Sequence, residues 1–161
     1  MGDDQVTHAL LRHTLATVAY RGGKALRGAP VAFAAFREQD GSRTPGEIVA
    51  HMGDLFDWAL TLAKGAQSWH DSAPQAWDRD VDRLFTALQA LDAYLASGAP
   101  LACSDQQLFQ GPIADALTHV GQLTMLRRLS GAPIRGENYF KAPITIGRVG
   151  ADQAPPPAEF G

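Results

Sequence analysis

The chain has 161 residues, a formal net charge of -3 and one cysteine. This length suits a single domain, which we predict over residues 1–161. One cysteine excludes both an internal disulfide framework and a zinc site built from several cysteines, and a pI near 5.9 argues against a general nucleic-acid binder. Alanine, the strongest helix former, is the most frequent residue, so the composition favours an all-α protein.

The start of the chain, MGDDQVTHALLRH, lacks the basic segment and apolar stretch of a signal peptide. The sequence also contains no apolar run long enough to predict a membrane-spanning helix. We therefore expect a cytoplasmic protein that binds neither membranes nor nucleic acid.

Hydrophobic spacing predicts a first helix over residues 4–20, ended by Gly22 and Gly23. Residues 31–37 can form a short helical stretch. The next helix has the clearest start, since Thr44 can cap it, Pro45 suits its first position and Glu47 follows the cap by three residues. We predict this helix over residues 45–64.

A third helix is expected from Ser72 or Ala73 to about residue 97, and a fourth from Pro112 to Ser130. These four segments predict a four-helix bundle over residues 4–131, and the long connection at residues 22–44 permits a crossover. Proline and glycine make residues 132–161 irregular. We expect this segment to be ordered to about residue 149 and mobile beyond it.

Three polar residues are candidates for a metal site. Asp115 and His119 are four residues apart, which places both side chains on one face of a helix, and His51 lies in the apolar stripe of another helix. Two imidazoles and one carboxylate can hold a divalent ion and leave positions open for water or substrate. The simpler alternative is a hydrogen-bonded core histidine beside an ordinary ion pair.

Two segments carry a family resemblance. The string TPGEIVAHMGDL, with His51, resembles the first motif of the DinB/YfiT-like metalloenzymes, and DALTHVGQLTMLRRLSG, with His119, resembles the second. The resemblance implies a four-helix bundle with a long crossover, a homodimer, and a metal held by a histidine of the second helix and a His-x-x-x-His pair of the fourth. By position, His51 and His119 match the first and last ligands. Asp115 departs from the family's histidine, although a carboxylate can also bind Zn, Ni, Fe or Mn.

The resemblance implies a metal-dependent hydrolase or a thiol-dependent transferase or isomerase, acting on a small molecule or a low-molecular-weight thiol. No residue is evident as a separate catalytic acid or base. The alternative is a non-catalytic, dimeric helical bundle that serves in stress or ligand binding. Gln122 is a candidate partner for His119, and residues 136–140 can fold over the mouth of the bundle.

Other features have simpler interpretations. The three tryptophans can line a pocket but at these spacings are more often core or interface residues. Cys103 is expected to be an inert small hydrophobe. Residues 121–161 carry a net charge of +2, which suits ordinary solvation or, alternatively, the capture of an anionic substrate.

Overall fold

The computed structural model describes residues 3–161, with side chains from residue 8 onward, and the regular secondary structure of this part of the chain is helical apart from one isolated β-bridge between Glu137 and Glu159. Its main helices are α1 (Asp3–Leu26), α2 (Pro45–Lys64), α3 (Trp77–Ala96) and α5 (Ala114–Leu129). Shorter helical elements are η1 (Val31–Ala35), α4 (Asp105–Leu108), the π-helical turn η2 (Phe109–Ile113) and η3 (Tyr139–Lys141). The predicted four-helix bundle is therefore confirmed.

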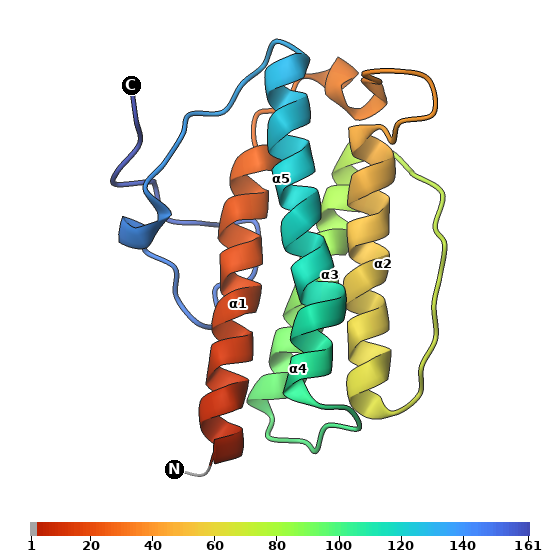
Figure 1. Ribbon diagram of the computed structural model, residues 1–161, viewed down its shortest axis with the longest axis vertical. Coiled ribbons are helices and arrows are strands. Elements are labelled where there is room, and N and C mark those ends of the chain that lie inside the picture. The colour runs from red at the N-terminus through yellow and green to blue at the C-terminus, as the bar shows by residue number, and fades with distance from the viewer. Residues whose placement is uncertain (1–2) are drawn as a thin grey trace.

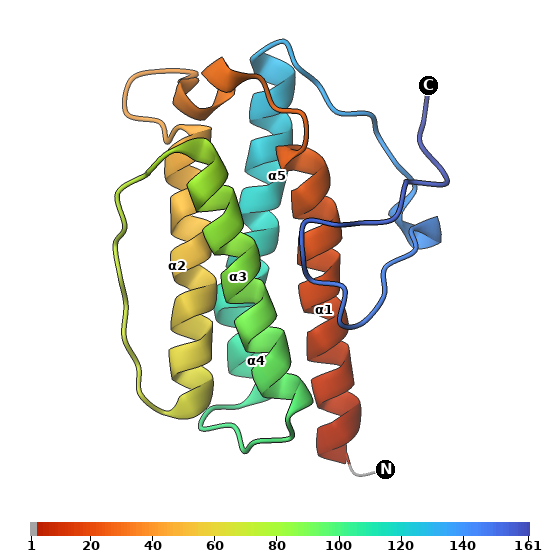
Figure 2. The same cartoon turned by 180° about the vertical axis from the view of Figure 1, so that it is seen from behind.

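Helices α1 and α5 run in one direction, and α2 and α3 run in the other (Figure 1). Both α1 and α2 pack against α3 and α5. Because α2 and α3 are parallel, residues 65–76 must return along the whole length of the bundle, as both views show (Figures 1 and 2). The expected crossover thus exists, but it follows α2. The connection before α2 only crosses one end of the bundle.

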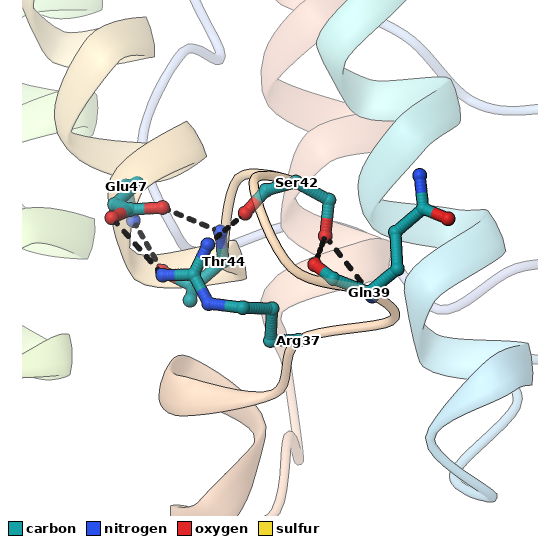
Figure 3. A network of polar contacts seen from close by, with 5 residues as sticks. All are labelled: Arg37, Gln39, Ser42, Thr44 and Glu47. Carbon is teal, nitrogen blue, oxygen red and sulfur yellow. Dashed lines mark hydrogen bonds and ion pairs between the residues drawn. The ribbon is translucent and has the colours of Figure 1, made fainter.

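The start of α2 follows from its sequence. The Thr44 hydroxyl accepts the backbone N–H of Glu47 at 3.2 Å, and the Glu47 carboxylate accepts the backbone N–H of Thr44 at 2.7 Å (Figure 3). This reciprocal pair satisfies two N–H groups that the first turn of a helix leaves free. Gly65, with φ of 77°, ends the helix in the left-handed region that glycine tolerates best.

The predicted end of the first helix is wrong. Gly22 and Gly23 are both helical, and α1 continues to Leu26. A Cβ atom at Gly22 would lie 3.5 Å from the Val120 side chain of α5, and one at Gly23 would lie 3.3 Å from that of Arg27. Both glycines lie within the packed part of α1, and the helix stops only before Gly28, whose φ is 62°.

The predicted starts of the third and fourth helices are also wrong. Helix α3 begins at Trp77, because the residues before it are extended and Gln75 donates its backbone N–H to Asp80 at 2.7 Å. The fourth helical segment begins much earlier than Pro112, at a capping box formed by Ser104 and Gln107. The π-helical turn η2 accommodates Pro112, so the proline does not break the segment.

The crossover is fastened to α2 by one buried carboxylate. Asp54 accepts hydrogen bonds from the backbone N–H and the hydroxyl of Ser72, at 2.9 and 2.7 Å. Arg83 of α3 lies 3.0 Å from the same carboxylate and also donates to the backbone carbonyl of Ala50. Asp54 therefore joins α2, α3 and residues 65–76 in one arrangement.

Residues 130–161 lie along the outer side of α1 (Figures 1 and 2). Glu137 accepts a hydrogen bond from Tyr20 at 2.6 Å and one from Lys24 at 2.8 Å, and Lys24 also donates to Glu159 at 2.8 Å. We call these four residues the Lys24 network. The segment expected to be mobile beyond residue 149 is instead bonded back to α1, and residues 136–140 pack on α1 rather than over the bundle mouth.

Within the described residues, none of the helices combines the length and the apolar character needed to cross a bilayer.

Candidate metal centre

The three residues selected from the sequence meet between two helices. His51 lies in the second turn of α2, and Asp115 and His119 lie on α5. One potential ligand atom from each residue can be chosen so that all lie within 4.8 Å of one another. Residues 64 positions apart in the sequence are therefore brought to one point.

The Asp115 carboxylate lies between the two imidazoles. Its Oδ2 is 3.4 Å from His51 Nε2, and its Oδ1 is 3.3 Å from His119 Nδ1. His119 Nδ1 lies closer still, at 2.7 Å, to the backbone carbonyl oxygen of Asp115. A carbonyl can only accept, so Nδ1 carries the proton and the lone pair of the neutral ring is on Nε2. Metal-binding histidines are commonly oriented by such a bond through the other ring nitrogen.

The centre is half open to solvent. The His119 side chain is 8% exposed and that of His51 18% exposed, whereas 44% of the Asp115 side chain is accessible. Burial lowers the pKa of His51, and the electrostatic influence of the neighbouring His119 and Arg43 lowers it further, against the opposing effect of Asp115. His51 is therefore biased towards the neutral ring, which is the form that binds metals.

The donor set fits a divalent ion of the borderline class. Two ligands of a tetrahedral ion bound at 2.0–2.2 Å are separated by about 3.4 Å. His51 Nε2 and Asp115 Oδ2 are already 3.4 Å apart, whereas the three potential ligand atoms are up to 4.8 Å from one another and would move closer around an ion. Imidazole suits Zn, Fe and Ni, and a carboxylate extends the range to Mn. This group of residues could hold a metal ion, with the exposed side of Asp115 left for further ligands.

Two grooves open beside the centre, one at each histidine. The groove at His119 has a volume of about 530 Å³ and a largely apolar wall that includes Ile48 and Met125. The groove at His51 has a volume of about 300 Å³ and a more polar wall. Ser42 and Arg43 border both grooves, so the loop before α2 forms the partition between them.

Hydrogen bonds hold this loop in shape (Figure 3). The Ser42 hydroxyl donates to the carbonyl of Gln39 at 2.7 Å, and Arg37 donates to the carbonyl of Ser42 and to Glu47. Arg43, by contrast, makes no ion pair with any described side chain. Its charge faces the grooves from a loop whose conformation is already fixed.

One residue near the centre was not singled out by the sequence. Trp69, from the crossover, lies edge-on to His51 with ring centroids 5.6 Å apart and to Trp58 at 5.7 Å. The general expectation that tryptophans line a pocket gives a weak signal for this contact. Its contact with His51 depends on the path of residues 65–76, and no local sequence pattern predicts that path.

Other candidate residues have ordinary roles. Gln122 lines the groove at His119, but the ring is oriented by the carbonyl of Asp115 rather than by this amide. His70 is exposed in the crossover. Burial raises the pKa of the Cys103 thiol, and Asp105 adds to the effect, which agrees with an inert cysteine.

The chain was compared with protein-family models, curated proteins and solved structures, and none of the three comparisons found a match.

Proposed function

We propose that this chain is a divalent-metal-dependent enzyme of the DinB-like family, either a hydrolase or a thiol-dependent transferase or isomerase. The observation that supports this proposal best is the meeting of His51 from α2 with Asp115 and His119 from α5. The crossover between two parallel helices agrees with the architecture that the two sequence motifs imply.

The chain's own residues have separable roles in this proposal. His51 and His119 bind through neutral ring nitrogens, and Asp115 supplies a negative charge that offsets that of the cation. Trp69 covers His51 and limits water on that side. Arg43 offers a positive charge at the partition between the two grooves and attracts an anionic group of a substrate or thiol.

A divalent ion at this centre would lower the pKa of a bound water or thiol and so supply a nucleophile near neutral pH. The two grooves leave room beside the histidines for a small molecule. The apolar groove suits the carbon skeleton of such a molecule, because contact with Ile48 and Met125 removes apolar surface from water.

The direct test is a titration of metal-free protein with Zn²⁺, Ni²⁺ and Mn²⁺ by calorimetry. We expect one ion per chain, and a loss of affinity of about 100-fold or more in His119→Ala and in Asp115→Ala/His119→Ala, since loss of an outer partner alone costs roughly 10–100-fold. His13→Ala, which removes an exposed histidine of α1, is the matched control. An absence of stoichiometric binding, or unchanged binding in the double variant, would contradict the proposal.

Catalysis requires a second measurement. The metal-loaded protein should accelerate the reaction of a small thiol with an electrophile, or the hydrolysis of an ester, and the His119→Ala variant should not. Metal binding without either activity would favour the second candidate, a ligand-binding bundle. The feature that favours this candidate is the pairing of His51 and His119 with Asp115, which already satisfies both rings in part.

We also propose that the protein forms a homodimer. Leu10 of α1 and Phe109 of η2 are large apolar residues outside the groove at His119, and both are about half exposed or more. A second copy that covers these residues would remove apolar surface from water. Light scattering at micromolar concentration should give twice the mass of the chain, and a monomer would exclude this part of the proposal.

A further inference from the structure

A further pocket, separate from the two grooves at the histidines, lies on the side of α5 that faces away from His119. It has a volume of about 450 Å³ and is enclosed by α1, α5 and the C-terminal segment. Its residues on α5, among them Leu117, Gly121 and Arg128, recur at spacings of about one helical turn. A pocket of this size is in the range that holds small molecules.

Three arginines surround this pocket. Arg21 comes from α1, Arg128 from the last turn of α5 and Arg135 from the C-terminal segment. Arg135 is 3.5 Å from Glu159. In the part of the chain with described side chains, neither Arg21 nor Arg128 has a carboxylate partner. The neighbouring Arg127 differs in this respect, because it is buried and donates to the backbone carbonyls of Ala25, Arg27 and Ala132.

The acidic groups near the pocket are already neutralised. Glu137 receives hydrogen bonds from Tyr20 and Lys24, and Glu159 receives one from Lys24. The three arginines and Lys24 outnumber these two glutamates by two charges. The pocket is therefore positive in a protein whose net charge is -3. A local excess of this kind attracts anions.

The rest of the lining is apolar and aromatic. Tyr139 holds the guanidinium of Arg21 above its ring at 4.1 Å, so this arginine is ordered by stacking and keeps its N–H groups for a ligand. Phe160 and Ile134 add apolar surface at the C-terminal side. Gly121 contributes no side chain, and a Cβ atom built there would meet no atom within 4 Å.

We infer that this pocket binds a small organic anion, with a flat apolar body against Tyr139 and Phe160 and a carboxylate or phosphate head held by Arg21 and Arg128. The guanidinium group is suited to both heads because it donates two parallel hydrogen bonds to either. This site is separate from the metal centre, and neither depends on the other.

The test uses the metal-free full-length chain and the fluorescent aryl sulfonate 8-anilinonaphthalene-1-sulfonate, whose sulfonate takes the place of the natural head group. We expect saturable binding, of which one site per chain belongs to this pocket and is lost in Gly121→Leu. Phenyl phosphate or benzoate should displace the probe, and whichever is stronger identifies the head group. Phenol, which has the same ring without the charge, should not displace it.

Two kinds of variant separate this pocket from other surfaces. Gly121→Leu fills the open space on α5 with a better helix former, so it should block the pocket without loss of folding. Arg21→Gln/Arg128→Gln removes the two unpaired charges and should weaken binding at least about tenfold. Arg79→Gln, an exposed position on α3 away from the pocket, is the matched charge control and should bind the probe as the original chain does.

The inference is overturned if the probe does not bind saturably, if phenol competes as well as the anions, or if the folded Gly121→Leu variant binds normally. Circular dichroism of each variant establishes that it is folded, and Gly121→Leu alone decides the question should the arginine variant unfold. His119→Ala should bind the probe normally, so a failed metal centre and a failed anion pocket give different results.

Discussion

The candidate metal centre and the Lys24 network are both polar clusters between neighbouring elements of one bundle, and they are bonded in opposite ways. In the Lys24 network, contacts of 2.6–2.8 Å join Tyr20, Lys24 and Glu137, which are almost fully buried, to one another and to Glu159, whose side chain is 24% exposed. In the metal centre, the side-chain contacts of Asp115 with the two histidines are 3.3–3.4 Å, and nearly half of its side chain is exposed.

This difference shows which cluster is structural and which can accept a further partner. Burial by itself would lower the pKa of Lys24, but the hydrogen bonds and charges of Glu137 and Glu159 outweigh it and raise that pKa above its ordinary value. Lys24 therefore stays charged, and the hydrogen bonds of Lys24 and Glu137 are formed within the protein. His51, His119 and Asp115 keep lone pairs that no protein donor fills well, which is what a cation requires.

Loss of the Glu137 carboxylate should have the largest effect on stability. Glu137→Ala leaves Lys24 buried beside one remaining partner and removes the acceptor of Tyr20, so we expect the free energy of unfolding to fall by about 3–5 kcal/mol. Urea denaturation measures this loss, and Zn²⁺ titration of the folded variant should give the original affinity. Asp152→Asn, at an almost fully exposed carboxylate of the same segment, should change little. A parallel loss of metal affinity would show that the two clusters are not independent.

Loss of the Asp54 carboxylate should have an effect on stability between those expected at Glu137 and at Asp115. Asp54→Ala removes both hydrogen bonds to Ser72 and should cost about 2–3 kcal/mol of unfolding free energy. It should also free the crossover, so the fluorescence of Trp69 beside His51 should change even in the folded protein. Asp57→Asn keeps Asp54 and its two bonds, and is the control for a lost contact with Arg83. Unchanged fluorescence would show that residues 65–76 are held by other contacts.

Asp115→Ala should have the opposite effects to Glu137→Ala, with little loss of stability and a large loss of metal affinity. Its contacts are long and half exposed, so the free energy of unfolding should change by less than about 1 kcal/mol. Its affinity for Zn²⁺ should nevertheless fall sharply, because the carboxylate is the only acidic member of the cluster. Chemical denaturation without metal, followed by titration of the same sample, measures both. A large loss of stability would indicate that Asp115 is structural like Glu137.

The smallest expected effect is on the loss of stability at acidic pH. The hydrogen bond from Lys24, supported by the charges of Lys24 and Arg135, lowers the pKa of Glu159 below its ordinary value of 4.5 despite a small opposing effect of burial. A lowered folded-state pKa means that this contribution to stability is complete above pH 4.5 and is lost as the pH falls through the folded value. Glu159→Gln should remove that part of the pH dependence. Urea denaturation from neutral to acidic pH, compared between the two proteins, provides the measurement.

The sequence predicted those parts of the molecule that depend on local rules. The Thr44 capping box defined the start of α2 to the residue, and the four-residue spacing of Asp115 and His119 placed both on one face of α5. His51 was a candidate because it lies in the apolar stripe of its helix, and the resemblance to a family motif supported that choice. Each of these inferences needs only the geometry of a single helix or a known order of motifs.

The sequence could not predict features that depend on packing between distant segments. Gly22 resembles a helix terminator until Val120 is found beside it, and Pro112 resembles a helix start until the π-helical turn accommodates it. Likewise, Trp69 meets His51 only because the crossover follows the bundle, and Glu137 reaches Lys24 only because the C-terminal segment returns to α1. A single sequence contains no local signal for such meetings.

The π-helical turn at residues 109–113 has a consequence for the rotational phase of the fourth helical segment. A π turn contains one residue more than an α turn, and each residue in an α-helix accounts for about 100° of rotation. Deletion of Gly111 would restore an ordinary helix but would rotate Asp115 and His119 relative to the anchored Ser104 cap. The segment could then keep the Ser104 cap or the contact of Asp115 and His119 with His51, but not both. The extra residue thus reconciles the two ends of the segment, and the direction in which the Asp115 and His119 side chains point depends on it.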